Sequence, residues 1–376
     1  MRVGIDARLF SEPVTGIGRY TREVIKELIN KPGQYQLYSP IPITDEDFYK
    51  NNVEIRSANF NSRVQKMLWS QTHMPYLASK DKVDLFWGTT HRLPHYLPNN
   101  IARVVTIHDL VWKHAGKTMR PLSLWMEKTM MPQAILQADR VVAVSRSTAK
   151  AIEDEYPSIK EKIRVVYPGT TDLPKPNDFQ SLSCFGIKHP YFLFVGTLEP
   201  RKNLQLLLKA YASLDACTRS RANLVIAGGD GWGGTNYTQL IHQLGLNDQV
   251  IFTGYINDFH LSTLYANALF LAMPSLYEGF GLPIVEAMSF GVPVITSDRS
   301  SLPEVAGDAG VLVDPFNIIS IANGLFSLLH DDTYRDKLAS MALNNSKRFS
   351  WKFAADELWN IFNEAVEVRS RLVCDI

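Results

Sequence analysis

One stretch around residue 280 constrains the fold more than any other part of the chain. The apolar run 269–274 is typical of a buried strand, and the glycine-bearing loop 278–282 follows it. Pro283 suits a helix start, because the N–H that proline lacks is one that the first turn leaves unpaired. Gly291 suits the C′ position that ends a helix, and 292–296 is typical of the next strand. The stretch therefore predicts a strand–loop–helix–strand unit of an α/β sheet.

The same loop has the chemistry of a ligand site. A glycine-bearing loop and a helix N-terminus present backbone N–H groups that bind anions, phosphate above all. Glu278 and Glu286 flank the helix start, and such carboxylates suit the hydroxyl groups of a sugar or a ribose. From these residues alone a structural alternative stays open, in which Glu286 caps the helix and Glu278 is a surface loop residue.

The residues from Tyr277 to Gly291, YEGFGLPIVEAMSFG, resemble the signature of the retaining glycosyltransferases of family 4. Members of that family transfer sugars from nucleotide-sugar donors. The resemblance implies that Glu278 contacts the donor sugar and that Glu286 binds the ribose. It also implies that the loop between them contacts the donor through Gly279, Phe280, Gly281 and Leu282.

Length and composition describe an ordinary globular protein. A chain of 376 residues predicts two or three domains, and 45% apolar with 20% charged residues is usual for such a chain. The apolar runs are far shorter than the ~20 residues of a membrane-spanning helix, and the N-terminal segment carries charge too early for a secretory signal. Cys184, Cys217 and Cys374 are scattered and odd in number, which favours a reducing compartment over a disulfide framework or a Cys-rich metal site. We therefore expect a cytoplasmic protein.

The charges are unevenly spread along the chain. Residues 1–175 hold 25 Lys and Arg against 18 Asp and Glu, a balance of +7, and residues 176–376 hold 14 against 20, a balance of −6. No basic run is interleaved with aromatic residues, so nucleic-acid binding is not expected. A positive N-terminal half could favour an anionic membrane or acceptor, or the asymmetry could be a chance distribution of solvated surface charges.

The first half alternates strands and helices, as a doubly wound α/β domain does. We expect a strand over 1–6, then a loop with Gly16 and Gly18, and a helix over 19–29. The two glycines could let the loop approach a ligand, or could simply form a tight turn. Further strands are expected at 36–39, 53–55, 83–87, 103–107, 140–145 and 164–167, with a helix over 63–79.

His108 and Asp109 directly follow a predicted strand, at the edge where open α/β sheets bind ligands. In isolation such a pair can be purely structural. The sequence Thr-Ile-His-Asp-Leu is similar to a strand-end motif of the family, and this implies that His108 contacts the donor sugar near the reacting carbon and that Asp109 belongs to the donor site.

Two other stretches of the first half have alternative interpretations. Residues 111–140 combine apolar, aromatic and basic side chains, and Lys113, Lys117 and Arg120 are among the basic ones. We favour packing of this segment in the core. An exposed portion would instead suit an acceptor site or a membrane interface. Asp45-Glu46-Asp47 contains the Asp-x-Asp pattern of some metal-dependent sugar transferases. Because no strong strand precedes it, we interpret it as a solvated loop and expect no metal site.

The second half begins with a strand over 191–195, followed by Gly196, Thr197 and the cations Arg201 and Lys202. Cations at a helix start are disfavoured by the helix dipole. A bound diphosphate would compensate for them, although two exposed surface cations are an equal alternative from spacing alone. Later strands are expected at 224–229, 250–252 and 311–313, and helices at 204–214, 261–268, 317–330, 333–346 and 351–369.

The resemblance to family 4 assigns roles to this part of the chain. It implies that the segment from Gly196 to Lys202 holds the donor's diphosphate and that Gly254 and Tyr255 lie by the nucleotide base. It also implies an α/β protein of two doubly wound Rossmann-like domains facing a cleft, the GT-B fold. We expect an N-terminal acceptor-side domain at 1–171, a C-terminal donor domain at 172–350, and a final helix at 351–376 that crosses back to the first domain.

The implied activity is transfer of a hexose to an acceptor hydroxyl with retention at the anomeric carbon. His108, Arg201, Lys202 and Glu278 would be the catalytic residues, without a cofactor or a metal. Motifs similar to those of bacterial mannosyltransferases of surface-polysaccharide synthesis favour GDP-mannose as the donor and a lipid-linked glycan as the acceptor, with possible peripheral contact with an anionic membrane. A UDP-sugar donor, a nucleotide-sugar epimerase of the same fold, and a non-enzymatic sugar-nucleotide binding module are the alternatives. The sequence leaves open a front-face mechanism and a covalent intermediate.

Overall fold

The computed structural model describes residues 1–11, 16–60, 62–187 and 190–374, which fall into two compact units. The first unit comprises Met1–Leu110, Pro121–Gly169 and Ser350–Ile376, and the second comprises Val111–Arg120 and Thr170–Phe349. Two features differ from the predicted division. The change of unit falls after Gly169 instead of residue 171, and the segment Val111–Arg120 belongs with the second unit although the chain around it belongs with the first.

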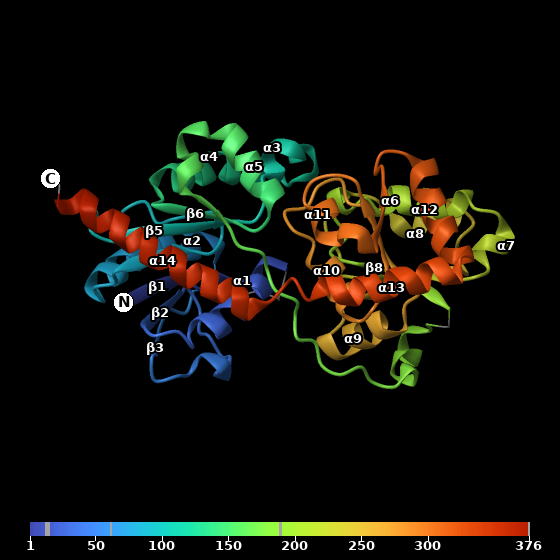
Figure 1. The fold of residues 1–376 in the computed structure, drawn as a ribbon, viewed down its shortest axis with the longest axis horizontal. Coiled ribbons are helices and arrows are strands. Elements are labelled where there is room, and N and C mark those ends of the chain that lie inside the picture. The colour runs from blue at the N-terminus through green and yellow to red at the C-terminus, as the bar shows by residue number, and fades with distance from the viewer. Residues whose placement is uncertain (12–15, 61, 188–189, 375–376) are drawn as a thin grey trace. The chain divides into compact units, whose positions relative to one another are not determined.

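Seven parallel strands form the sheet of the first unit (Figure 1). In spatial order they are β3 (Val53–Ser57), β2 (Gln34–Ser39), β1 (Arg2–Asp6), β4 (Leu85–Gly88), β5 (Ala102–Ile107), β6 (Arg140–Ala143) and β7 (Ile163–Val165). The central strands are buried almost throughout, which explains their continuous apolar sequences. The strand order changes direction between β1 and β4, and ligands of open α/β sheets bind beyond the carboxyl ends of the strands at such a point.

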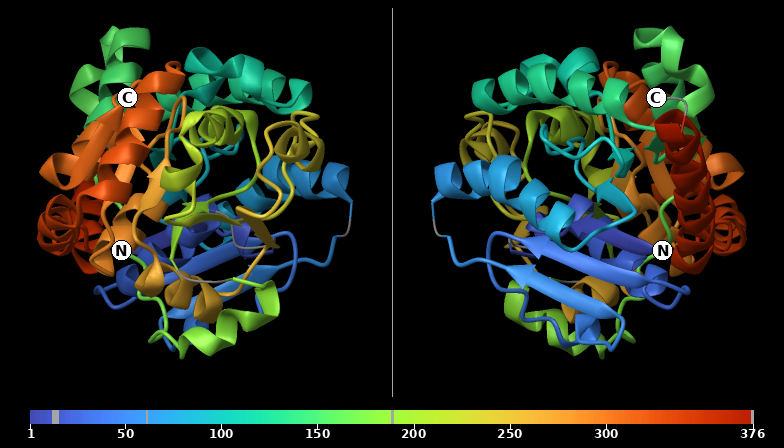
Figure 2. Two further views of the ribbon diagram at one scale, coloured as in Figure 1. Left: turned by 90° about the vertical axis from the view of Figure 1, so that its right-hand side faces the viewer. Right: turned by 90° about the vertical axis from the view of Figure 1, so that its left-hand side faces the viewer.

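Helices cover this sheet, and the last helix of the chain is one of them. The helices of the first unit are α1 (Gly16–Leu28), α2 (Arg63–Lys80), α4 (Pro121–Gln137), α5 (Arg146–Glu155) and α14 (Trp351–Cys374). Figures 1 and 2 show α14 in red alongside the strands of this unit. Its apolar face packs on α1, β4 and β5, with the ring centroids of Trp351 and Tyr20 (α1) 5.7 Å apart and those of Phe362 and Trp87 (β4) 5.6 Å apart. Arg369 pairs with the buried Asp139 at 2.8 Å, so both packing and charge hold α14 on the first unit.

The second unit has a six-stranded parallel sheet of the same kind. In spatial order its strands are β10 (Val250–Gly254), β9 (Asn223–Ala227), β8 (Tyr191–Val195), β11 (Leu271–Met273), β12 (Val294–Ser297) and β13 (Gly310–Val313). The helices of this unit are α3 (Val111–His114), α6 (Leu204–Ser213), α7 (Ala216–Arg219), α8 (Tyr237–Gln243), α9 (Asp258–Asn267), α10 (Leu282–Ser289), α11 (Leu302–Ala306), α12 (Ile318–His330) and α13 (Asp332–Ser346). Here the strand order changes direction between β8 and β11.

Short 3-10 turns complete both units. They are η1 (Arg8–Ser11), η2 (Glu46–Phe48), η3 (Gly116–Thr118), η4 (Pro157–Lys162), η5 (Phe179–Phe185), η6 (Pro200–Lys202) and η7 (Gly307–Ala309). The prediction of two Rossmann-like α/β domains is confirmed, and the predicted strands agree with the observed ones to within a few residues. The long helix α4 was not predicted as a single element, because its apolar residues point in several directions and Pro132 lies inside it.

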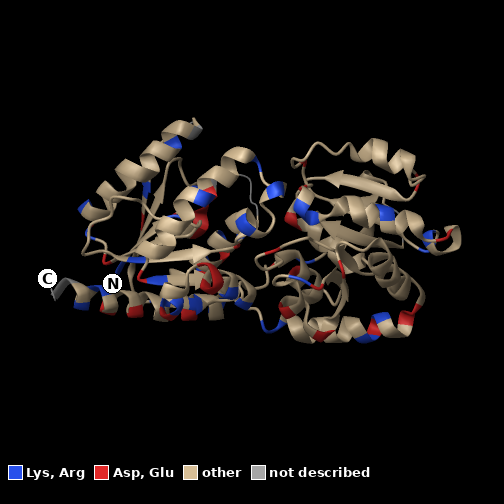
Figure 3. Ribbon diagram, turned by 90° about the horizontal axis from the view of Figure 1, so that it is seen from above, with Lys and Arg blue, Asp and Glu red and all other residues tan. Residues whose placement is uncertain are grey.

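Charge is more evenly distributed between the units than along the sequence. The residues of the first unit include 24 Lys and Arg against 22 Asp and Glu, a balance of +2, and those of the second include 15 against 16, a balance of −1. Figure 3 shows both signs interspersed over each unit. The asymmetry of +7 against −6 is therefore a property of the linear halves, since α14 brings acidic residues to the first unit and Val111–Arg120 takes three cations from it.

Candidate functional site

The predicted phosphate-binding residues lie where β8 and β11 diverge in the second unit. Beyond β8 the chain forms η6, and Asn203 then adopts the left-handed conformation (φ 61°) from which α6 begins. The buried side-chain amide of Asn203 donates to the carbonyl groups of Pro274 at 3.0 Å and Pro315 at 2.7 Å. The η6 turn is therefore fastened to the segment after β11, which brings its two cations to the loop that carries Glu278.

Glu278 is the shared partner of both predicted cations. Arg201 Nη1 pairs with Glu278 Oε2 and also donates to the carbonyl of Tyr277 at 3.1 Å. Lys202 Nζ lies 2.7 Å from Glu278 Oε1, and Arg201 Nε lies 3.2 Å from Glu199 Oε2. Lys202 and Glu278 are buried, with 8% and 6% of their surfaces exposed. The interpretation of Arg201 and Lys202 as two exposed surface cations is wrong.

Burial and ion pairing set the charge of these carboxylates. Burial alone would raise the pKa of Glu278, but the neighbouring Arg201 and Lys202 lower it to about 2, so the carboxylate is ionised at neutral pH. Burial raises the pKa of Glu199 above its ordinary value, although Arg201 and Lys202 oppose this. Glu278 is therefore the fixed negative partner of the two cations.

Two serines hold the Glu278 loop, and the sequence did not identify them. Ser300 Oγ accepts the backbone N–H of Glu278 at 3.1 Å, and Ser301 Oγ lies 2.9 Å from the carbonyl oxygens of both Glu278 and Phe280. The position of this serine pair, directly before a helix, suits a helix cap. Helix α11 does begin at Leu302, but Ser301 makes no side-chain cap bond and binds the loop instead. No sequence pattern identifies a serine as the partner of a loop that lies 22 positions earlier in the chain.

Helix α10 begins where the sequence predicts, with one shift. Gly281 precedes it with φ 107°, a conformation that strains any side chain, and an added Cβ would lie 3.1 Å from Leu302. Leu282 is the first helical residue, so Pro283 is the second and not the first. Gly291 follows the helix with φ 72°, which confirms its prediction as the stop.

Glu286 lies on α10 with both carboxylate oxygens engaged inside the protein. Oε1 accepts the hydroxyl of Thr171 at 2.8 Å, and Oε2 accepts the hydroxyl of Tyr265 at 3.0 Å. Glu286 is 4% exposed. These two contacts orient the carboxylate of Glu286.

The other residues predicted for the donor site lie on the same edge of this sheet or near it. Gly196 (φ 144°) packs against the Lys202 side chain, so that an added Cβ would lie 3.3 Å from Lys202 Cε. Thr197 follows it, and its carbonyl accepts the N–H of Glu199 at 2.7 Å. Gly254 (φ 69°) ends β10, and the side chain of Tyr255 is exposed.

The segment Val111–Arg120 packs on the second unit beside the donor loops. His114 stacks on Tyr277 with ring centroids 5.1 Å apart, Trp232 Nε1 donates to the Thr118 carbonyl at 2.6 Å, and Arg120 lies over the Trp232 ring at 5.2 Å. The expectation that Lys113, Lys117 and Arg120 belong to the N-terminal domain is therefore wrong, because these contacts place the whole segment in the second unit. Sequence proximity to α4 gave no indication of this.

In the first unit the predicted glycine loop is shorter than expected. Gly16 and Gly18 lie in the first turn of α1, which begins at Gly16 and not at Arg19. Arg8–Ser11 form η1, and residues 12–15 of the predicted loop lie outside the described residues. An added Cβ at Gly16 would meet no atom within 4 Å, so packing does not require glycine there.

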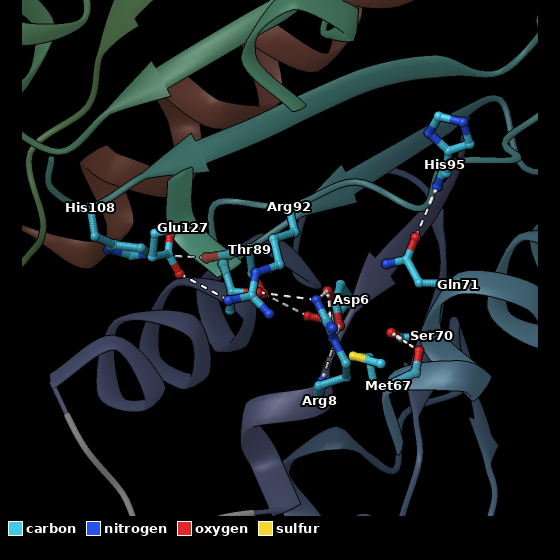
Figure 4. Close-up of polar contacts among 11 residues, drawn as sticks. Asp6, Arg8, Met67, Ser70, Gln71, Thr89, Arg92, His95, His108 and Glu127 are labelled. Carbon is cyan, nitrogen blue, oxygen red and sulfur yellow. Dashed lines mark hydrogen bonds and ion pairs between the residues drawn. The ribbon is translucent and has the colours of Figure 1, made fainter. Parts of the chain in front are cut away.

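His108 and Asp109 follow β5, as predicted, at the carboxyl edge of the sheet. His108 is 7% exposed, and its Nε2 lies 2.8 Å from the carbonyl oxygen of Thr89, beyond β4. Figure 4 shows this contact together with neighbouring polar side chains of the same edge. Burial lowers the pKa of His108 to about 3, so the ring is neutral.

A second polar group at this edge was missed by the sequence reasoning. Asp6 ends β1, is fully buried, and pairs with Arg8 through Nε and Nη2, at 2.8 and 2.5 Å (Figure 4). Arg8 Nη2 also reaches Thr90 Oγ1 at 3.3 Å. The signal was present in the Ile-Asp-Ala-Arg sequence after the first strand, because a carboxylate at a strand end followed two residues later by arginine is able to form such a bidentate pair.

The Asp-x-Asp segment has a structural role. Asp45 caps the η2 turn and pairs with Arg22 at 2.7 Å, and Asp47 pairs with Lys26 at 2.5 Å, which ties the turn to α1. The segment is thus a short helical turn rather than a loop. Among the described residues, no group of three or more His, Cys, Asp or Glu side chains could hold a metal ion. Within the same ranges, no helix is long and apolar enough to cross a bilayer.

The sequence matches two family models, one in each half. Residues 14–172 match Glycosyltransferase Family 4, and residues 185–346 match Glycosyl transferases group 1. Over 380 aligned residues the chain is 32% identical to the O-antigen chain mannosyltransferase B of Escherichia coli, covering 93% of this chain and 96% of that protein. The chain therefore belongs to this family of glycosyltransferases.

Solved structures of low sequence identity share the fold. Sucrose-phosphate synthase from Thermosynechococcus elongatus superposes with a TM-score of 0.79 at 19% identity, covering 98% of this chain and all of that one. Anabaena HepE in complex with UDP and glucose gives a TM-score of 0.75 at 19% identity, covering 96% of this chain and 98% of the other. These likenesses confirm the α/β architecture of two Rossmann-like domains.

Proposed function

We propose that this glycosyltransferase moves mannose from GDP-mannose to a hydroxyl of a lipid-linked glycan during O-antigen or related polysaccharide synthesis. The observation that carries the proposal is the Arg201–Lys202–Glu278 cluster at the point where β8 and β11 diverge. The mannose assignment rests on the similarity to the Escherichia coli mannosyltransferase over nearly the whole chain. No metal or cofactor is part of the proposal, because two cations already lie at the proposed phosphate site.

The cations would act on charge that develops during transfer. As the bond between the anomeric carbon and the diphosphate oxygen breaks, negative charge accumulates on the phosphate. Arg201, Lys202 and the N-terminus of α10 would stabilise this charge, and such preorganised groups are the strongest single contribution to many enzymatic rates. Glu278 would orient both cations and contact the sugar, which acquires oxocarbenium character.

Retention of the anomeric configuration is the proposed stereochemical course. The leaving phosphate would accept the proton of the acceptor hydroxyl as the new glycosidic bond forms on the same face. A His108 pKa of about 3 supports this course, because so weak a base is a poor acceptor for that proton at neutral pH. A covalent glycosyl-enzyme intermediate is the alternative, and trapping with a fluorinated donor distinguishes the two.

The donor is tested by ligand-induced stabilisation. A nucleotide sugar that binds only the folded chain, at a free concentration of 100 times its Kd, raises the free energy of unfolding by about 2.7 kcal/mol. We expect GDP-mannose to raise the melting temperature most among GDP, UDP and ADP sugars. A larger shift with a UDP-sugar would replace the donor, and the glycosyltransferase assignment would remain.

Two further alternatives are separated by the acceptor. An epimerase of the same fold would convert its nucleotide sugar without an acceptor, whereas a transferase releases nucleotide in proportion to glycosylated acceptor. A binding module would bind nucleotide sugar tightly and turn over no donor. The cluster of buried cations and carboxylate favours transfer, and NMR of the product's anomeric proton tests retention with GDP-α-mannose as donor.

We also propose that the protein works in the cytoplasm and contacts the membrane that holds its acceptor. Helix α2 carries the partly exposed Lys66 and the exposed Lys80 and has no acidic residue in its sequence, and its Leu68 side chain is 54% exposed. Trp125 on α4 is 62% exposed. Basic helices with exposed apolar side chains bind at membrane interfaces. This surface replaces the one expected at Lys113, Lys117 and Arg120.

A further inference from the structure

His91 lies between His108 and Glu127 in the first unit, on the loop that follows β4. Its side chain is buried, its Nδ1 is 3.1 Å from Glu127 Oε2, and its Nε2 accepts the backbone N–H of His108 at 2.9 Å. The backbone of His91 is left-handed (φ 60°), and its N–H donates to the Thr106 carbonyl at 3.1 Å. Few non-glycine residues adopt this conformation, although histidine does so more often than most, and the contacts described above help to hold it.

The hydrogen-bond donors define the tautomer of His91. A backbone N–H can only donate, so Nε2 must carry a lone pair, and the hydrogen of the neutral ring is on Nδ1, facing Glu127. Burial would raise the pKa of Glu127, but the hydrogen bond from His91 and the charge of Arg92 lower it to about 2, so its carboxylate accepts this hydrogen. Burial would lower the pKa of His91, but Glu127 raises it above its ordinary value. A second ring hydrogen would lie on Nε2 and point at the N–H of His108. This geometry therefore favours the neutral ring.

His108 is fixed at both ends as a result. Its N–H is held by His91, and its Nε2 must carry the ring hydrogen, because the Thr89 carbonyl can only accept. The neutral ring therefore has its lone pair on Nδ1, for which no hydrogen-bond partner occurs among the described residues. A buried imidazole with one unused acceptor atom suits a ligand hydroxyl group.

We propose that His91, with its tautomer set by Glu127, is a positioning residue that holds His108 so that Nδ1 accepts a hydroxyl of the bound sugar. The inference rests on the proposed function and on the donor-sugar contact that the family resemblance implies for His108. The opposite interpretation is that His91 only fastens the loop to α4 through Glu127, as the neighbouring Arg92 does at 2.9 Å.

Two amide substitutions separate these interpretations. His91→Gln places an acceptor near the position of Nε2 and loses the bond to Glu127, whereas His91→Asn keeps a donor near Nδ1 and loses the acceptor for His108. Asparagine also tolerates the left-handed backbone better than glutamine does. If His91 positions His108, the Asn variant should be the more stable and the less active of the two, with kcat reduced about 10- to 100-fold and donor KM little changed.

The matched control is Gln71→Leu. Gln71 fastens the same loop to α2 by accepting the N–H of His95 at 3.2 Å (Figure 4), and no hydrogen bond joins it to His91, both being described residues. This variant should lower the melting temperature and leave kcat unchanged. If His91→Asn keeps wild-type kcat, or if kcat follows melting temperature across all three variants, the positioning role is overturned.

A measurement independent of turnover completes the test. In ¹⁵N-histidine NMR at neutral pH, His91 should show hydrogen on Nδ1 only and His108 on Nε2 only, and His91→Asn should broaden or shift the His108 signals. A doubly protonated His91 at pH 7 would overturn the inference whatever the activity. Failure of the wild-type chain to transfer any sugar, with these tautomers intact, would instead contradict the proposed function.

Discussion

Lys202 lies 2.7 Å from Glu278, so the cation expected to hold the donor's phosphate is already paired with the carboxylate expected to contact the donor's sugar. Both side chains are buried, and the carboxylate is ionised because its pKa lies at about 2. A bound diphosphate would share Lys202 with Glu278 rather than meet an unpaired cation. In the proposed function, the pair would therefore couple the orientation of the sugar contact to that of the phosphate contact.

The first prediction concerns the two cations. Replacing Arg201 or Lys202 with alanine should reduce kcat by about two orders of magnitude, because each removes a preorganised charge from the leaving phosphate. Arg221→Ala, an exposed cation of the same unit, is the control and should leave kcat unchanged. Steady-state transfer assays give kcat, and calorimetry gives nucleoside affinity, which should change little. Equal losses of nucleoside and nucleotide-sugar binding would show that the pair has a structural role only.

The second prediction separates the two glutamates. Glu286→Ala should weaken nucleotide binding by about 1.5–3 kcal/mol, the range for a lost hydrogen bond to a charged acceptor. Glu278→Ala should spare nucleotide affinity and damage transfer. Tyr265→Phe removes the 3.0 Å bond that the protein itself makes to Glu286 and leaves the carboxylate in place. If Tyr265→Phe weakened nucleotide binding as much as Glu286→Ala does, the effect would come from misplaced packing rather than from a lost ribose contact.

The third prediction concerns acid stability. The pKa of Glu278 falls from 4.5 to about 2 on folding, so its ionised form stabilises the protein above pH 4.5, and this stabilisation is lost as pH falls from 4.5 toward 2. The shift corresponds to a contribution on the order of 3 kcal/mol. Denaturant titrations between pH 7 and 3 should show a smaller loss of unfolding free energy with falling pH for Glu278→Gln than for the wild type. Glu127 titrates in the same range, so part of the slope should remain. An unchanged slope would contradict the predicted shift.

The parts of the fold that sequence predicted well are those with local causes. The strands are continuous apolar runs, and the turns at Gly281 and Gly291 need a positive φ that glycine supplies. The same local chemistry places Arg201, Lys202 and Glu278 at strand ends. Their mutual pairing could not be predicted, because it depends on Asn203 fastening η6 to two distant carbonyl groups.

The misses have nonlocal causes. Ser300 and Ser301 bind a loop more than 20 residues away, and Val111–Arg120 joins the second unit through Trp232 and Tyr277. The apparent charge asymmetry vanished for the same reason, since the units are not the halves of the sequence. Patterns within a segment carry no information about such partners.

The fourth prediction concerns metal. Transfer should survive EDTA, because Arg201 and Lys202 supply the positive charge that a divalent ion supplies in metal-dependent transferases, and because Asp45 and Asp47 are paired with Arg22 and Lys26. The assay compares initial rates in EDTA with rates in Mg²⁺ or Mn²⁺. Activity that disappears in EDTA and returns with either ion would contradict the assignment of the phosphate site.

The last prediction concerns the membrane. Leu68 on α2 and Trp125 on α4 expose 54% and 62% of their surfaces. Both helices bind the loop that follows β4. Helix α2 does so through the bond between Gln71 and His95, and α4 through the bond between Glu127 and Arg92. Burying a large apolar side chain contributes about 1.5–3 kcal/mol. Replacing both with serine should therefore reduce binding to anionic vesicles at least about tenfold, as measured by sedimentation at low salt.

The control for this experiment is Phe353→Ser on α14, where the side chain is equally exposed at 60%. It should not change vesicle binding, and raising the salt should weaken the wild type, because the cations of α2 act on the anionic surface over only about one Debye length. In a second variant, Lys113, Lys117 and Arg120 are replaced with glutamate. If this variant loses vesicle binding and the Leu68 and Trp125 variant keeps it, the membrane contact is made by the segment that packs on the second unit. Equal binding to anionic and neutral vesicles would contradict the electrostatic part of the proposal. No binding to either kind of vesicle would contradict the whole proposal, and the exposed apolar side chains of α2 and α4 would then bind a partner other than lipid.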